Sequence, residues 1–173
     1  MTSERFGIIK FKGQEATVVG ADLKAGEAAP EFSAHTLDWS AFNGLAGTQG
    51  KVRIIAAVPS LDTEVCDRET RRFNQEASSL SKDIAILVIS TDLPFAQKRW
   101  CGAAGVENLK TYSDHREAAF GLAYGVLIKE LRLLARAVFV VDKGGKVRHV
   151  QLVEELANEP DYEAVLQAVR GLV

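Results

Sequence analysis

The sequence predicts an α/β sandwich in which helices flank a central mixed β-sheet. Strand-like and helix-like patterns alternate along most of the chain, and two of the strand-like runs are nearly all apolar, as expected of strands covered on both faces. Of its 173 residues, 47% are apolar and 25% are charged, which is the composition of an ordinary globular domain. We therefore expect a single domain over residues 1–173, large enough to need neither a metal nor a disulfide framework.

The individual elements follow from these patterns. An N-terminal β-hairpin is predicted by the runs 6–11 and 16–19, which flank the glycine turn Lys12-Gly13-Gln14-Glu15. Apolar runs predict five further strands, at 32–37, 52–58, 84–90, 136–141 and 147–152. Apolar residues at three- and four-residue spacing predict four helices, at 64–80, 94–101, 116–124 and 161–173. The last two strands are expected to form a hairpin through Asp142-Lys143-Gly144-Gly145.

Charge and apolar length exclude several classes of partner. Lys plus Arg number 21 and Asp plus Glu number 23, so the net charge of −2 offers no basic excess for nucleic acid or an anionic membrane. Residues 1–13 lack the apolar core of a signal peptide, and the longest apolar runs fall far short of the roughly 20 residues of a membrane helix. We therefore expect a cytoplasmic protein, in which a cysteine pair is more often catalytic, redox-active or metal-binding than structural.

Motifs for phosphate, metal or dithiol chemistry do not fit this sequence. Segment 44–51 resembles a phosphate loop, but it has one residue too many between its glycines, and Val52 replaces the required hydroxyl residue. The three histidines His35, His115 and His149 are far apart, and there is no Cys-x-x-Cys. We therefore interpret 44–51 as a surface turn and expect neither a cofactor nor a metal.

Cys66 is distinguished by its predicted place in the first turn of a helix. The strand 52–58 ends at Pro59, and the next residues lead into a helix for which Thr63 is a suitable N-cap. Cys66 is then the third helical residue, where free backbone N–H groups and the helix dipole stabilise a thiolate. It also shares the core-facing stripe with Thr70, Phe73, Ala77 and Leu80, so it is equally well interpreted as a small buried apolar residue.

The spacing Pro59-x-x-x-Thr63-x-x-Cys66 is similar to the active-site motif of the peroxiredoxins, and the chain resembles their bacterial thiol peroxidase branch. This resemblance extends over almost the whole chain, and includes 59–63 with Val65-Cys66, Arg72-Phe73-Asn74, Asp92-Leu93-Pro94-Phe95 to Cys101-Gly102, Ala135-Arg136-Ala137, Gln151-Leu152-Val153 and Glu159-Pro160-Asp161-Tyr162. It implies a thioredoxin-like peroxiredoxin fold.

The resemblance also implies a role for each motif residue in an atypical two-cysteine scheme. Cys66 would be the peroxidatic nucleophile and Cys101 the resolving cysteine, joined by an intramolecular disulfide that thioredoxin reduces. Arg136 and Thr63 would hold the peroxide and stabilise charge, and Pro59 would shield the thiolate from water. The substrates would be hydrogen peroxide and organic hydroperoxides, and the assembly would be a homodimer.

Two alternatives use the same residues. A peroxide-responsive redox sensor would form the same disulfide without multiple turnover, whereas a one-cysteine peroxidase would leave Cys101 with a structural role. A disulfide requires Cα atoms within about 7 Å. Because both cysteines lie on predicted helices, we expect one helix end to open, helped by the segment Gly102-Ala103-Ala104-Gly105.

Overall fold

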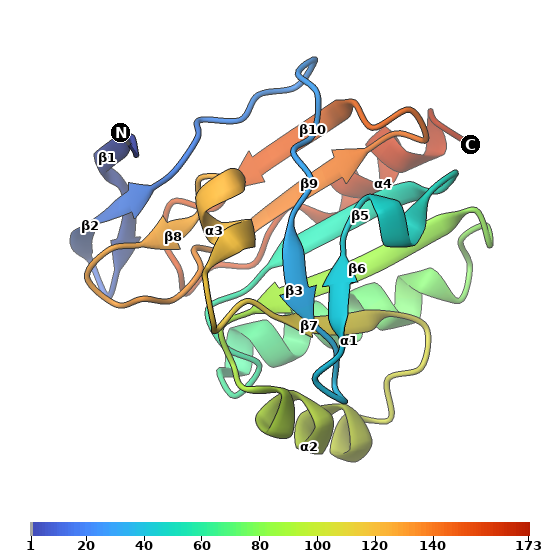
Figure 1. Cartoon of the computed structure of the whole chain (residues 1–173), viewed down its shortest axis with the longest axis horizontal. Coiled ribbons are helices and arrows are strands. Elements are labelled where there is room, and N and C mark those ends of the chain that lie inside the picture. The colour runs from blue at the N-terminus through green and yellow to red at the C-terminus, as the bar shows by residue number, and fades with distance from the viewer. Residues whose placement is uncertain (1) are drawn as a thin grey trace.

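The computed structural model describes residues 2–173 and confirms the predicted α/β fold with a mixed sheet (Figure 1). In chain order, its elements are β1 (Glu4–Phe11), β2 (Gln14–Val19), β3 (Ser33–His35), β4 (Ala41–Asn43), the 3₁₀ helix η1 (Ala46–Thr48), β5 (Val52–Ala57), α1 (Glu64–Ala77), β6 (Ile84–Ser90), α2 (Pro94–Ala104), β7 (Lys110–Ser113), α3 (Ala119–Ala123), β8 (Leu127–Ile128), β9 (Ala137–Val141), β10 (Val147–Leu152) and α4 (Tyr162–Arg170).

The central sheet has the strand order β10-β9-β5-β6-β7-β3-β4. Strands β5, β6 and β7 run parallel, with Val52 opposite Ile84, whereas β9 lies antiparallel on the other side of β5. Residues of β5 alternate between two cores: Ile55 and Ala57 face one, and Ile54 and Ala56 face the other. A strand buried on both faces needs an apolar residue at nearly every position, and this explains the apolar runs in the sequence.

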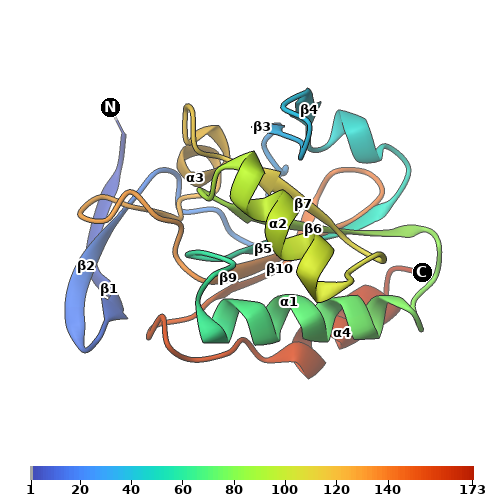
Figure 2. The ribbon, with the colours of Figure 1, turned by 90° about the horizontal axis from the view of Figure 1, so that it is seen from below.

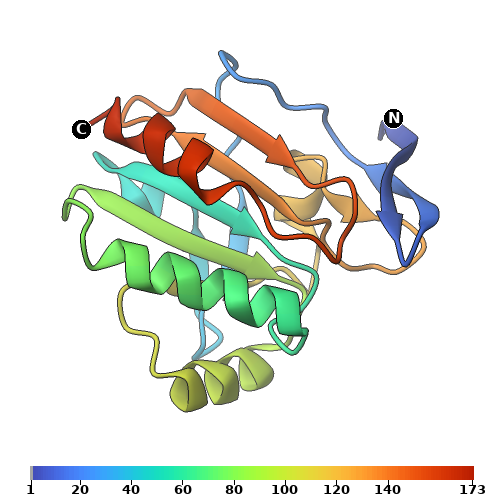
Figure 3. The same cartoon turned by 180° about the vertical axis from the view of Figure 1, so that it is seen from behind.

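Helices cover the two faces of the sheet unequally. Helices α1 and α4 lie side by side on one face, and α3 lies on the other, as the view from below shows (Figure 2). The view from behind shows α1 running alongside β6, with α2 beyond it (Figure 3). The core beneath α1 and α4 contains Cys66, Phe73 and Trp100. The end of β5 and the start of α1 therefore meet at a buried position.

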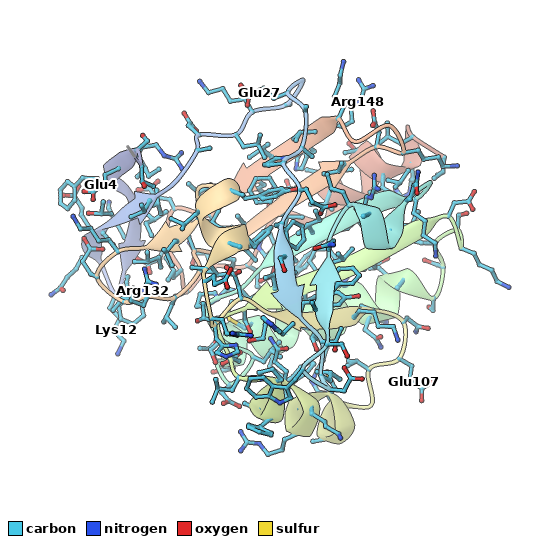
Figure 4. All side chains as sticks on the ribbon, in the orientation of Figure 1. Glu4, Lys12, Glu27, Glu107, Arg132 and Arg148 are labelled. Atoms are coloured by element: carbon cyan, nitrogen blue, oxygen red, sulfur yellow. The ribbon has the colours of Figure 1, made fainter. Side chains whose placement is uncertain are left out.

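The N-terminal hairpin is confirmed and forms a second sheet with β8, in the order β1-β2-β8. Its turn consists of Lys12 and Gly13, both with positive φ (51° and 77°), which matches the twist of the flanking strands. Figure 4 shows Lys12 at the turn of the hairpin. It also shows charged side chains of both signs around the periphery of the molecule. None of the helices in residues 2–173 is long and apolar enough to cross a membrane.

Several predicted boundaries differ from the structure. The helix predicted at 116–124 is confined to α3, because the Asp114 carboxylate accepts hydrogen bonds from the backbone N–H groups of Phe120 and Gly121 and fixes the start there. The surface turn predicted at 44–51 contains η1 and the buried Thr48, whose hydroxyl accepts a hydrogen bond from Arg53. The short strands β4, β7 and β8 were not predicted.

Candidate active site

The loop after β5 presents Cys66 as the sequence predicts, in the first turn of α1. Thr63 is the N-cap, and its hydroxyl oxygen accepts a hydrogen bond from the backbone N–H of Cys66 at 3.2 Å. The Cys66 side chain is fully buried, and so is Pro59 in the loop that precedes α1. Because the remaining N–H groups of this turn point toward the helix start, they favour negative charge on the sulfur.

Asp92 holds this loop in place from the end of β6. One of its carboxylate oxygens accepts a hydrogen bond from the Ser60 hydroxyl at 2.7 Å, and the other accepts one from the backbone N–H of Leu61 at 2.8 Å. The second oxygen also accepts from the Ser90 hydroxyl. Asp92 was noted only as part of the resemblance, because a contact across more than 30 residues leaves no local pattern in the sequence.

Arg136 reaches Cys66 from the position just before β9. Its Nη2 lies 3.3 Å from the Cys66 Sγ, and its Nη1 donates to a carboxylate oxygen of Glu69 at 2.5 Å. Nε and Nη2 also donate to the backbone carbonyl of Leu156, at 3.0 and 2.8 Å. Burial lowers the pKa of Arg136, but Glu69 and Cys66 more than offset this effect and raise it, so the guanidinium stays charged.

Glu69 is a buried member of the site that the sequence analysis did not identify. It lies one helical turn after Cys66, and its side chain is fully shielded from solvent. Burial raises the pKa of Glu69 to about 7, although Arg136 acts in the opposite direction. The signal in the sequence was its spacing of three residues from Cys66, which puts a carboxylate on the core-facing side of α1.

A cavity of about 190 Å³ opens beside these residues. Pro59, Thr63 and Arg136 form one side of it, while Leu156 and the hairpin residues Phe11 and Lys12 form other parts of its wall. The structure therefore brings together four of the five predicted site residues: Pro59, Thr63, Cys66 and Arg136. The Arg136 guanidinium and Thr63 line the cavity, and the buried Cys66 sulfur lies behind them, in contact with Arg136.

Cys101, the fifth predicted residue, lies on α2 and is not bonded to Cys66, since both thiols are free. Its Sγ is 3.4 Å from the Thr111 hydroxyl, and burial raises its pKa, which favours the neutral thiol. The neighbouring Trp100 donates to an Asp67 carboxylate oxygen at 2.8 Å, which fastens α2 to the first turns of α1. Helix α2 ends at Gly105 with φ of 65°, a left-handed conformation that glycine adopts without strain.

Groups of three or more metal-binding side chains do not occur within residues 2–173. The chemistry open to the site is that of a buried cysteine sulfur in contact with a cation, next to a small cavity that Thr63 also lines. Such an arrangement suits attack by sulfur on a small electrophile.

Comparison with known proteins points the same way. The Redoxin family model matches residues 24–166. The chain is 52% identical over 165 residues to a thiol peroxidase of Bacillus subtilis, covering 95% of this chain and 98% of that protein. It is 54% identical over 158 residues to a thiol peroxidase of Oceanobacillus iheyensis, covering 91% and 95%. A peroxiredoxin-like protein from Aquifex aeolicus superposes with a TM-score of 0.90 at 40% identity, covering 99% of each chain.

Proposed function

Since the chain belongs to the redoxin family and, within it, to the bacterial thiol peroxidases, we propose that it reduces hydrogen peroxide and organic hydroperoxides through Cys66. The observation that carries this proposal is the 3.3 Å contact between the Arg136 guanidinium and the Cys66 sulfur, inside a site capped by Thr63. A fixed positive charge beside a thiol at a helix start favours the thiolate, which is the reactive form.

Ionising the thiol accounts for only a small part of the rate. An ordinary thiol is about 3% thiolate at neutral pH, so full ionisation gains at most about thirtyfold, or roughly 2 kcal/mol. The larger part must come from holding the peroxide in line and stabilising charge on the leaving oxygen. Arg136 and Thr63 are the proposed donors and acceptors for this task, and Pro59 excludes water.

In the proposed cycle, the Cys66 thiolate attacks one peroxide oxygen, the O–O bond breaks, and the leaving oxygen takes a proton to become water or an alcohol. The resulting Cys66 sulfenic acid condenses with the Cys101 thiol, releasing water and forming a disulfide. A thioredoxin-type dithiol then reduces the disulfide. Since Trp100 is hydrogen-bonded to Asp67 in the reduced form, disulfide formation would require this contact to open.

A coupled assay tests this function. With thioredoxin, thioredoxin reductase and NADPH present, we expect many turnovers per protein with both hydrogen peroxide and a bulky organic hydroperoxide. Mass spectrometry after one equivalent of peroxide should find the Cys66–Cys101 bridge. NADPH oxidation that stops after about one turnover would instead establish a redox sensor, and steady turnover without the bridge would establish a one-cysteine peroxidase.

We further propose a homodimer in the cytoplasm, each chain acting as one domain. Trp39, Leu93 and Phe95 support self-association, because they form an exposed apolar surface at the start of α2, with Trp39 and Phe95 ring centroids 5.0 Å apart. Light scattering coupled to gel filtration should give twice the chain mass. Phe95 is exposed and is not part of the cavity wall, so Phe95→Glu should shift the protein to monomer, and a monomeric native protein would contradict the proposal.

A further inference from the structure

One cation serves two acidic groups at the centre of the site. Arg136 donates through Nη1 to Glu69 at 2.5 Å and contacts Cys66 through Nη2 at 3.3 Å, while its remaining hydrogen bonds go to the neutral carbonyl of Leu156. The three side chains are buried. If Glu69 and Cys66 were both ionised, this buried group would carry a net charge of −1, which is costly for side chains removed from solvent.

Within residues 2–173, Arg136 is the one cation that forms an ion pair with Glu69. Glu159, which precedes α4, and Tyr162, the first residue of α4, are the other titratable neighbours of Glu69, and Tyr162 donates its hydroxyl hydrogen to Glu159 at 2.8 Å. Arg68 lies 3.9 Å from Glu159 and is half-exposed. The second carboxylate oxygen of Glu69 has no hydrogen-bond partner among residues 2–173. Burial and the nearby Glu159 therefore favour a protonated Glu69, against the attraction of Arg136.

On the basis of the function proposed above, we propose that Glu69 and Cys66 share a single proton through their common partner Arg136. Glu69 thereby controls how much of Cys66 is thiolate at a given pH. When Cys66 is oxidised, the shared proton leaves and Glu69 becomes a carboxylate. Glu69 is a positioning residue in this proposal, since it contacts Arg136 and not the cavity. Two strongly interacting acids titrate as a pair, so removing one of them changes the titration of the other.

The proton balance of the oxidation follows from this sharing. The reduced site holds one proton on the Glu69 and Cys66 pair and one on the Cys101 thiol. When sulfur attacks the hydroperoxide, the S–O bond forms, the O–O bond breaks, and the leaving alkoxide gains one proton. This proton comes from the Glu69 and Cys66 pair, which leaves Glu69 ionised beside Arg136. Cys101 gives up its proton as the S–S bond forms and the sulfenic oxygen leaves as water. The oxidation therefore takes up no proton from the solvent.

Replacing Glu69 by Gln removes the shared proton and keeps an oxygen that can accept from Arg136. With no competing carboxylate, Arg136 favours the Cys66 thiolate alone, so oxidation of Glu69→Gln should take up one proton from the solvent per protein at neutral pH. The measurement mixes reduced protein with one equivalent of hydroperoxide in weak buffer containing a pH indicator. The ultraviolet absorbance of the thiolate should also develop at a pH lower by about one unit or more than in the native protein.

Glu76→Gln is the matched control, because Glu76 lies on the same helix and pairs with Arg72 at 2.7 Å. It should behave as the native protein, with uptake close to zero. Uptake of one proton by the native protein, or identical titrations and uptake in native and Glu69→Gln proteins, would overturn the sharing. The proton uptake of the native protein tests the sharing even if Glu69→Gln fails to fold. Failure of the proposed function is seen separately, as absence of continuous turnover, because the thiolate titration uses no peroxide.

Discussion

Replacing Cys66 by Ser is expected to abolish peroxide turnover and leave the protein folded. A serine hydroxyl is not ionised at neutral pH, even beside Arg136, so the nucleophile is lost, and we expect peroxide consumption to fall by at least about 10⁴-fold. Serine is close to cysteine in size, and Cys66 forms no disulfide in the structure, so the packing beneath α1 should survive. The coupled assay measures the first effect, and thermal unfolding measures the second.

Cys101→Ser is the matched control, because it removes the other thiol and leaves the nucleophile in place. This variant should consume about one equivalent of peroxide and then stop, with a sulfenic acid on Cys66 that a thiol-reactive probe for that group detects. Steady consumption by Cys66→Ser would refute Cys66 as the nucleophile. Full turnover by Cys101→Ser with thioredoxin would refute its role as the resolving cysteine, and would favour the one-cysteine alternative.

The parts of the molecule that could be predicted from the sequence are those fixed by neighbouring residues. The start of α1 could be located because Thr63 caps the helix only three residues before Cys66. Strands β6 and β9 could be located because both faces of each are covered, so nearly every residue is apolar. The resemblance then assigned Arg136, which no local pattern identified as a partner of Cys66.

The parts of the fold and of the site that could not be predicted depend on contacts between distant segments of the chain. Glu69 and Arg136 are 67 residues apart, and the carbonyl of Leu156 that holds Arg136 comes from a loop without any characteristic residue type. Strands β4, β7 and β8 contain two to four residues, too few to show a two-residue period. Their pairing is decided by the neighbouring strands. A site built where such segments meet therefore has members that become visible only in three dimensions.

We expect the second large effect from replacing Arg136, because this residue contributes both to the stability of the fold and to the proposed reaction. Arg136→Met should leave Glu69 buried without a cation and lower the free energy of unfolding by about 3–5 kcal/mol. It also removes the donor beside Cys66, and kcat/KM for peroxide should fall by at least about 10²-fold. Urea unfolding and the coupled assay measure these two losses separately.

The stability loss should depend on pH with a definite sign. The pKa of Glu69 is raised from 4.5 to about 7 in the folded protein, and losing Arg136 would raise it further. A carboxyl group with a raised pKa in the folded state destabilises the fold once it ionises, so the deficit of Arg136→Met should grow as pH rises through that pKa. Below about pH 4.5, where the folded and unfolded states are both protonated at Glu69, the deficit should be smallest.

A double variant separates the two roles of Arg136. Combining Arg136→Met with Glu69→Met replaces the whole buried pair by apolar side chains, which is often neutral or stabilising, so most of the lost unfolding free energy should return. Activity should not return, since neither methionine can favour the thiolate or hold a peroxide oxygen. If the double variant regained peroxidase activity along with its stability, Arg136 would act only by balancing Glu69, and its proposed part in the chemistry would be wrong.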